Sequence, residues 1–301
     1  MKRRDFVAMI PALALVQNNQ NKTLELPISS NGYNWQTFFK REGKVWGEHI
    51  NEDIAYYSQS GLKAYEPSIE NPKHAEEIMA ALKKNDIKMP SIYINSLLHL
   101  ESEAPKSIDN FLAIANQVKK FGTKIIVTNP TPIKWGSANQ KTDDQLIFQA
   151  KMLKKLGALL KSQGISLAYH THDMELKGGA REFHHMMQNV EPEFMSFCMD
   201  VHWIFRGSDN SQLPIFDVIK MYGNRIIELH IRQSKNGIWQ EVFTAEGDID
   251  YNKFVFELNK NKIKPHIVIE QCLEKGSPNT MDVINAHKID LQEIKKTFKL
   301  Y

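Results

Sequence analysis

Cysteine is scarce in this sequence, and its two copies are not spaced for metal binding. Only Cys198 and Cys272 occur among the 301 residues. No CxxC pair is present, so the sequence does not support a thiolate zinc site. Both cysteines fall inside expected buried strands, where a free thiol behaves as a small hydrophobic side chain. We therefore expect two buried thiols rather than a disulfide.

An excess of one charge is also missing. The 38 Lys and Arg residues nearly balance the 35 Asp and Glu residues, which gives a formal net charge of +3. The paired lysines at 119–120, 154–155 and 295–296 lie in amphipathic helical patterns, which is typical of solvated helix faces. Nucleic-acid binding would require a clustered basic face. We therefore expect no nucleic-acid partner.

No hydrophobic run is long enough to span a bilayer. The apolar stretch Val7–Val16 follows a charged start, and Ala12 and Ala14 offer small residues for cleavage. The run Arg3–Phe6 resembles a twin-arginine export signal. We predict that residues 1–24 are an export signal with a short disordered lead, without a membrane anchor, and that the protein is periplasmic or otherwise exported. The alternative is a frayed N-terminus on a cytoplasmic protein.

Glycine-rich phosphate loops are absent as well. No dinucleotide fingerprint follows the first expected strand, which disfavours a nicotinamide enzyme. No linker or low-complexity segment interrupts the chain after residue 24. The length and the hydrophobic content of 42% suit one domain with a large core, so we expect a single domain over residues 25–301.

What the sequence does contain is a regular alternation of strand and helix patterns. Eight apolar strand-like runs are separated by helical patterns, and they lie at Leu24–Ser30, Leu62–Pro67, Ile87–Ile94, Thr123–Asn129, Ile165–His172, Met195–His202, Ile226–Arg232 and His266–Cys272. Such alternation is typical of a parallel sheet covered by helices. Eight units favour an α/β fold of the closed (β/α)8 TIM barrel type.

The last four of these strands carry His, Asp or Glu near their C-terminal ends. Side chains alternate faces along a strand, so His170 shares a face with His172, and Asp200 shares one with His202. The same spacing relates His230 to Arg232, and Glu270 stands near the end of the last strand. Active sites of such barrels lie at this mouth.

A bound divalent cation would explain why His, Asp and Glu residues recur at the ends of these four strands. Each polar residue alone is more simply a satisfied core or rim residue, but burying several unpaired carboxylates and imidazoles is costly. Mixed nitrogen and oxygen ligands suit Mn²⁺, Zn²⁺, Co²⁺, Fe²⁺ or Mg²⁺, and the sequence does not choose among them.

The strand ends also resemble motifs of the xylose isomerase-like barrel superfamily, in particular its sugar phosphate isomerase/epimerase-like branch. The resemblance extends from about residue 28 to residue 299, and its motifs correspond to Tyr169–Glu175, Asp200–Trp203, His230–Gln233, Ala245–Asp250 and Glu270–Gln271, with Glu66 matching an acidic residue common after the second strand. The resemblance implies a TIM barrel that acts on sugars with a bound divalent metal.

Carried over by position, the resemblance implies that Asp200, His230 and Glu270 are metal ligands. Many relatives have a Glu as fourth ligand on the fifth strand, whereas this sequence has His170. We predict His170 as that ligand, with His172 as a substrate contact or as the actual ligand. Gln233 stands where relatives have an Asp.

The chemistry that follows is proton transfer beside a metal-polarised carbonyl of a small sugar or sugar derivative. We predict an isomerase or epimerase-type enzyme whose catalytic residues are Glu270, His202 and His172. A lyase or dehydratase acting on a keto-sugar or 3-keto-glycoside is the first alternative, and a non-catalytic sugar-binding barrel is the second. The sequence leaves open whether the protein forms a homo-oligomer.

Substrate contacts are predicted for Glu66, Arg232 and Trp203. Arg232 can hold a carboxylate, phosphate or hydroxyl, although a rim ion pair is nearly as common. Four tryptophans fall on expected loops or strand ends at the mouth, where aromatic walls suit sugar rings, although core-rim packing is the commoner case: Trp35, Trp46, Trp135 and Trp203.

Overall fold

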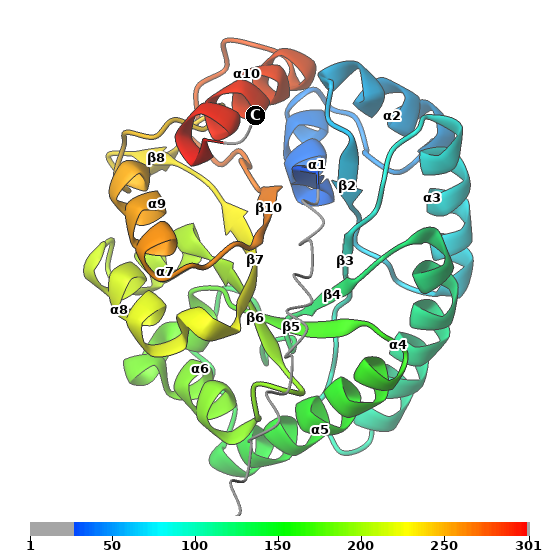
Figure 1. Cartoon of the computed structure of the whole chain (residues 1–301), viewed down its shortest axis with the longest axis vertical. Coiled ribbons are helices and arrows are strands. Elements are labelled where there is room, and N and C mark those ends of the chain that lie inside the picture. The colour runs from blue at the N-terminus through cyan, green and yellow to red at the C-terminus, as the bar shows by residue number, and fades with distance from the viewer. Residues whose placement is uncertain (1–26, 300–301) are drawn as a thin grey trace, which may run out of the picture.

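The computed structural model describes residues 27–299, in which parallel strands form a ring surrounded by helices (Figure 1). The ring strands are β1 Ser29–Asn31, β2 Ala64–Glu66, β3 Ser91–Tyr93, β4 Ile125–Thr128, β5 Ser166–His170, β6 Ser196–Asp200, β7 Ile226–Ile231 and β10 His266–Ile269. All eight expected strands are therefore found. The predicted export segment, residues 1–24, lies outside the described residues.

The eight strands are ordered as a barrel. Their order is β2-β1-β10-β7-β6-β5-β4-β3, and each described pairing between them is parallel. Isolated parallel bridges, Ala64 to Lys88 and Ser68 to Tyr93, connect the β2 and β3 segments. The single-domain (β/α)8 prediction is confirmed.

Ten α-helices are assigned between and after the strands of the described chain. They are α1 Gly32–Arg41, α2 Ile50–Tyr57, α3 Pro72–Lys84, α4 Ala104–Val118, α5 Asp143–Ser162, α6 Lys177–Asn189, α7 Val201–Gly207, α8 Leu213–Tyr222, α9 Tyr251–Lys260 and α10 Val283–Phe298. Short 3-10 turns lie at Ser58–Ser60, Lys119–Phe121, Met174–Leu176 and Gly223–Arg225. None of the helices in residues 27–299 combines the length and apolar content of a membrane span.

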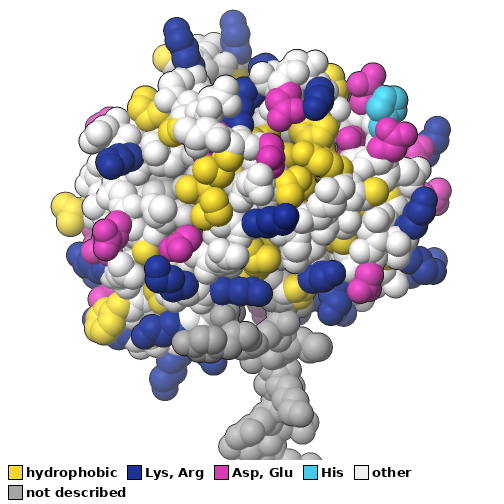
Figure 2. All heavy atoms as spheres, turned by 90° about the horizontal axis from the view of Figure 1, so that it is seen from above, with side chains coloured by type: hydrophobic (Ala, Val, Ile, Leu, Met, Phe, Trp, Pro, Cys, Tyr) yellow, Lys and Arg dark blue, Asp and Glu magenta, His cyan; other side chains and the backbone are white. Residues whose placement is uncertain are grey.

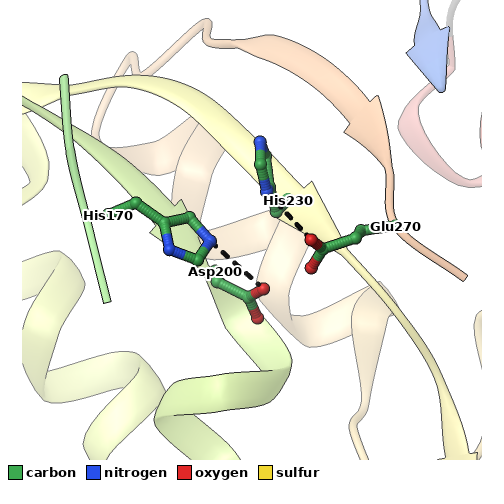
Figure 3. Close-up of side chains that lie close together, drawn as sticks. All are labelled: His170, Asp200, His230 and Glu270. Carbon is green, nitrogen blue, oxygen red and sulfur yellow. Dashed lines mark ion pairs between the residues drawn. The ribbon is translucent and has the colours of Figure 1, made fainter. Parts of the chain in front are cut away.

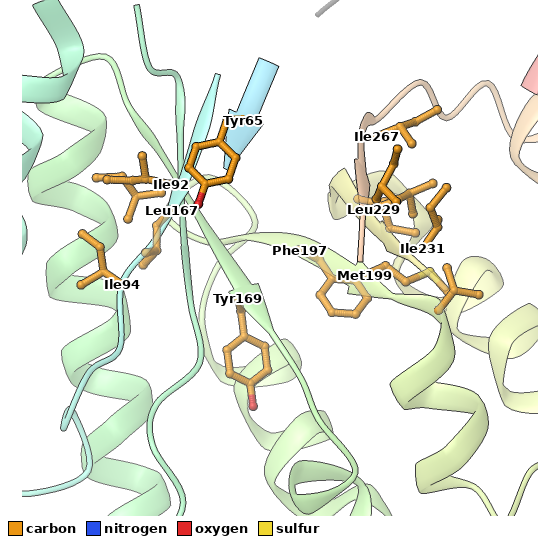
Figure 4. Close-up of a cluster of buried hydrophobic side chains, with 14 of the residues drawn as sticks. Tyr65, Ile92, Ile94, Leu167, Tyr169, Phe197, Met199, Leu229, Ile231 and Ile267 are labelled. Carbon is orange, nitrogen blue, oxygen red and sulfur yellow. The ribbon is translucent and has the colours of Figure 1, made fainter. Parts of the chain in front are cut away.

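The strands alternate between two faces, and this alternation separates the core from the site. Side chains on the outer face, including Leu167, Phe197 and Leu229, pack toward the helices (Figure 4). The other face of the strands presents Ile125, Val127, Ala168 and Cys198 in a smaller cluster. This period of two places His170, Asp200 and His230 inside the ring.

Three elements differ from the sequence prediction. Helix α1 occupies an expected loop, helix α7 begins directly after Asp200, and a two-stranded hairpin, β8 Ser234–Lys235 with β9 Ile238–Trp239, follows β7. Short elements of this kind are fixed by caps and tertiary contacts more than by periodicity. The early end of β6 means that strand parity does not place His202.

The structure also shows where the two cysteines and the charged side chains lie. Both cysteines are free and buried, as predicted. On the face drawn in Figure 2, Lys and Arg side chains are interspersed with Asp, Glu and apolar side chains.

Candidate metal centre

Four buried side chains converge inside the C-terminal end of the barrel (Figure 3). His170 ends β5, Asp200 ends β6, His230 lies in β7 and Glu270 follows β10. One candidate ligand atom from each lies within 4.8 Å of the others. Parallel pairing produces this convergence, because Asp200 is in register with His230 and His230 is in register with Val268, two residues before Glu270.

Asp200 uses one carboxylate oxygen for the fold and leaves the other toward the cluster. Its Oδ1 accepts a hydrogen bond of 2.7 Å from the Trp203 amide and so caps helix α7. Its Oδ2 lies 3.5 Å from His170 Nε2. Asp200 Oδ2 and both ring nitrogens of His170 are buried and have no hydrogen-bond partner within residues 27–299.

His230 and Glu270 each direct one polar atom toward the other and the second toward a charged neighbour. Glu66 Oε2 lies 3.0 Å from His230 Nε2, on the side away from the cluster. His230 Nδ1 lies 3.6 Å from Glu270 Oε1. Arg232 holds the other Glu270 oxygen, with Nη2 2.5 Å from Oε2. His230 Nδ1 is therefore oriented toward the cluster.

A second layer of buried polar side chains supports His230 from below. Asn31 donates to Glu66 Oε2 at 2.6 Å. Glu228 accepts from His266 at 2.8 Å, and the other His266 nitrogen lies 3.0 Å from Ser29 Oγ. A histidine whose second nitrogen faces a carboxylate has a fixed orientation and is a more basic ligand.

Burial and neighbouring charges shift the pKa values of the residues in the cluster. Burial raises the pKa of Asp200 well above its usual range, and the nearby Glu270 charge adds to this shift. Burial also lowers the pKa of His170 well below its usual range. Burial alone would raise the pKa of Glu270, but the Arg232 charge holds that pKa well below its usual value.

These residues fit a divalent cation. Each of the two carboxylates and two imidazoles offers one candidate ligand atom. Asp200 Oδ2, both His170 nitrogens and both His230 nitrogens are buried without a hydrogen-bond partner within residues 27–299, and a cation would compensate such atoms. Mixed N/O donors of this kind suit first-row divalent metals. The structure brings His170 rather than His172 into the four-residue cluster, and its role as the ligand remains a prediction.

The remaining predicted site residues lie around this cluster. His172 is partly exposed, with its ring 4.8 Å from that of His170. Burial lowers the pKa of His172 to about 4. Arg232 is fully buried against Glu270. Glu66 is also fully buried, which favours its contact with His230; a substrate contact remains a prediction.

His202 and Trp203 lie on α7 rather than on a strand. His202 is fully buried, and its Nε2 is 2.9 Å from the Ser234 hydroxyl, which in turn donates to Asp248 at 2.7 Å. Trp203 is half-buried, and its ring centre is 5.4 Å from that of His172. Its placement at the mouth agrees with the sequence interpretation.

Two of the expected mouth tryptophans are core residues instead. Trp35 is fully buried, with its ring 4.8 Å from those of Trp46 and Tyr57. Both rings are therefore core residues, which is the commoner case named for these tryptophans, and they form no aromatic wall for a sugar. Trp35 lies on α1, which forms in the expected loop, and Trp46 lies in the segment that follows α1.

Two relevant residues were not singled out from the sequence. Glu175, in the motif that begins at Tyr169, is buried, and its Oε2 accepts from the His172 amide at 2.7 Å. Trp239 reaches the site through the unpredicted β8–β9 hairpin, with its ring centre 4.0 Å from the Arg232 guanidinium. The motif that begins at Tyr169 could have pointed to Glu175. No local sequence pattern predicted that Trp239 would reach the site.

Comparisons with known proteins agree with this architecture. The chain is 25% identical over 256 residues to an inosose dehydratase of Mesomycoplasma hyopneumoniae, an alignment that covers 76% of this chain and 83% of the relative. Among solved structures, a sugar phosphate isomerase/epimerase from Parabacteroides distasonis superposes with a TM-score of 0.69 at 15% identity, covering 97% of this chain and 99% of that one.

Two further structures share the fold. A D-allulose 3-epimerase from Methylomonas sp., in complex with D-allulose, has a TM-score of 0.69 at 12% identity and covers 91% of this chain and 97% of its own. A Mycobacterium smegmatis barrel in complex with magnesium has a TM-score of 0.65 at 11% identity, covering 90% of this chain and 97% of that one. A family model described as xylose isomerase-like TIM barrel matches residues 54–289. The chain therefore belongs to the xylose isomerase-like TIM barrel family.

Proposed function

We propose that this chain is a metal-dependent isomerase or epimerase-type enzyme that moves a proton beside a carbonyl of a small sugar or sugar derivative. The observation that carries the proposal is the buried set His170, Asp200, His230 and Glu270, each with an available ligand atom. The donor set suits Mn²⁺, Zn²⁺, Co²⁺, Fe²⁺ or Mg²⁺. The family supports a sugar substrate, since relatives include an epimerase in complex with D-allulose.

When bound, a divalent ion would supply Lewis-acid polarisation of a substrate carbonyl, which acidifies the adjacent C–H. Burial lowers the pKa of His172 to about 4, so its imidazole is neutral near pH 7 and is a weak base. Its Nδ1 has no hydrogen-bond partner among the described residues and is available to accept a proton. Glu270, itself one of the four candidate ligands, offers a carboxylate that Arg232 holds in place. Trp203 and Arg232 form the adjoining wall that would contact sugar hydroxyls and ring faces.

A lyase reaction is the second candidate, and the similarity to inosose dehydratases favours it. Elimination removes a proton on one side of a carbonyl and expels an oxygen substituent from the next carbon. The neutral His172 serves this step as well as an isomerisation, and neither requires a pair of bases on opposite faces.

The test begins with metal analysis of the purified chain, followed by incubation with keto-sugars and glycosides in deuterated water with Mn²⁺. We expect about one divalent ion per chain and deuterium in the recovered sugar. An isomerase product keeps the substrate's composition, whereas a lyase product has lost water or an aglycone. Absence of metal contradicts the proposal, and sugar binding without exchange or product would identify a non-catalytic binding barrel instead.

Export by the segment over residues 1–24 is part of this proposal. The support is the charged and apolar pattern at Arg3, Arg4 and Val7–Val16. An exported enzyme of this type would meet sugars and glycosides outside the cytoplasm.

A further inference from the structure

A continuous arc of four rings runs along one side of the candidate metal centre. The Trp135 ring lies 4.9 Å from that of His172, His172 lies 5.4 Å from Trp203, and Trp203 lies 5.6 Å from Trp239. These residues come from the β4–α5 loop, the segment that follows β5, helix α7 and strand β9. Four separate segments therefore bring these rings into one row, from the exposed Trp135 to the buried Trp239.

This arc extends beyond the cluster of candidate ligands. His172 is the ring next to His170, at 4.8 Å, and Trp135 is one ring further out. Trp135 is 50% exposed, in contrast to the buried Trp35, Trp46 and Trp239. Trp135 is therefore the most exposed ring of the arc and lies one ring further from His170 than His172 does.

The loop that carries Trp135 is anchored at both sides. Lys141, itself almost fully buried, donates to the Pro130 carbonyl at 2.8 Å and pairs with Glu182 at 2.7 Å. Lys177 donates to the Ser137 carbonyl at 3.1 Å. An exposed tryptophan on an anchored loop is presented at low conformational cost, which is a property of binding residues.

The inner end of the arc offers polar groups. The Arg232 guanidinium lies 5.3 Å from the Trp203 ring centre and 4.0 Å from that of Trp239. Arg232 Nη1 and Trp239 Nε1 are buried and have no hydrogen-bond partner among the described residues. Hydrogen-bond donors beside aromatic faces match a ligand that has both hydroxyl groups and an apolar ring face.

We propose that Trp135 and the adjoining face of His172 form an outer subsite for the second ring of a glycoside, either an aryl group or a second pyranose. This inference rests on the proposed function, because the first ring is the sugar held beside His170, Asp200, His230 and Glu270. The substrate class is then a glycoside rather than a free monosaccharide.

Binding of three probes tests the subsite: methyl β-D-glucopyranoside, phenyl β-D-glucopyranoside and cellobiose, titrated by calorimetry into the Mn²⁺-loaded protein. We expect phenyl glucoside, cellobiose or both to bind about tenfold more tightly than methyl glucoside, as expected for one ring-stacking contact. A preference for one of the two identifies the second ring as aryl or pyranose.

Three variants make the test specific to Trp135. Trp135→Ala should remove the tenfold preference and leave methyl glucoside binding unchanged, and Trp135→Phe should keep most of it. Phe256→Ala removes another exposed aromatic side chain, on α9, and should change nothing. A preference that survives in Trp135→Ala, equal affinities in the wild type, or no binding of any probe overturns the subsite.

Metal content of the same samples separates the two proposals. A wild-type protein that holds metal but shows no ring preference overturns the outer subsite alone. A wild-type protein without metal overturns the proposed function and this inference with it.

Discussion

Arg232 holds Glu270 at two points. Its Nε donates to the Glu270 carbonyl oxygen at 2.6 Å, and its Nη2 donates to Oε2 at 2.5 Å. The guanidinium fixes both the backbone and the carboxylate of the residue that follows β10, and it leaves Oε1 toward His230. Arg232, singled out from the sequence as a substrate contact, is thus also a positioning residue for a candidate ligand.

Replacing Arg232 should therefore weaken metal binding. Arg232→Ala removes the hydrogen-bond donor to Glu270 Oε2 and the positive charge that lowers the pKa of Glu270. We therefore expect Mn²⁺ affinity to fall roughly 10–100-fold. The loss should be larger at pH 6 than at pH 8, because the Glu270 carboxylate then titrates nearer neutral pH. Calorimetric titration with Mn²⁺ measures this effect. Arg206→Ala, which removes a neighbouring guanidinium paired with Glu274, is the control, and an equal loss there would contradict the assignment.

The two oxygens of Asp200 have separable roles. Asp200→Asn keeps an oxygen that can cap α7 but removes the carboxylate charge, so we expect loss of bound metal with little loss of stability. Asp200→Ala should lose the metal and also about 1 kcal/mol of stability with the cap. Metal analysis and chemical denaturation of the metal-free proteins measure the two effects. The control is Asp250→Asn at the cap of α9, and full metal occupancy in Asp200→Asn would refute the ligand set.

Glu175 should make stability depend on pH. Burial raises its pKa from 4.5 to about 7, with the Glu182 charge adding to the shift. The folded protein therefore keeps this proton to higher pH than the unfolded chain does, and stability should fall as pH rises from about 4.5 to 7.

Glu175→Gln keeps an oxygen for the His172 amide and removes the titration. We expect the variant to gain on the order of 2 kcal/mol in free energy of unfolding over the wild type at pH 8, with no gain at pH 4.5. Urea denaturation at both pH values measures the difference. Glu101→Gln, at an exposed position, should show no such change with pH. A parallel pH profile for wild type and Glu175→Gln would contradict a buried neutral acid.

The predicted export signal depends on its arginine pair. Replacing both Arg3 and Arg4 with Lys preserves the positive charge but removes the twin-arginine motif, so we expect the precursor to accumulate in the cytoplasm. Cell fractionation and immunoblotting measure the distribution. Lys2→Arg is the matched control, and unchanged export of the double variant would refute the motif.

The fold followed from the sequence because its signals are local. Alternating apolar residues on eight strands and helical periods between them predict a barrel without reference to any distant contact. The same patterns place polar residues at the ends of the last four strands, and parallel strands bring those ends to one mouth. The choice of Asp200, His230 and Glu270 as candidate ligands came from the resemblance to the xylose isomerase-like superfamily. The two free thiols followed from their position in expected buried strands, and Cys272 is buried although β10 ends before it, at Ile269.

Only the tertiary structure decided what each polar atom contacts. Helix α7 starts at Asp200, so the cap takes one oxygen and His202 turns toward Ser234 rather than along a strand. Glu66 meets His230 because β2 and β7 face each other across the barrel, although 164 residues separate them along the chain. Trp239 reaches Arg232 through a hairpin that periodicity does not mark. Hydrogen bonds and ring contacts depend on distances between remote segments, and those distances exist only once the barrel has formed.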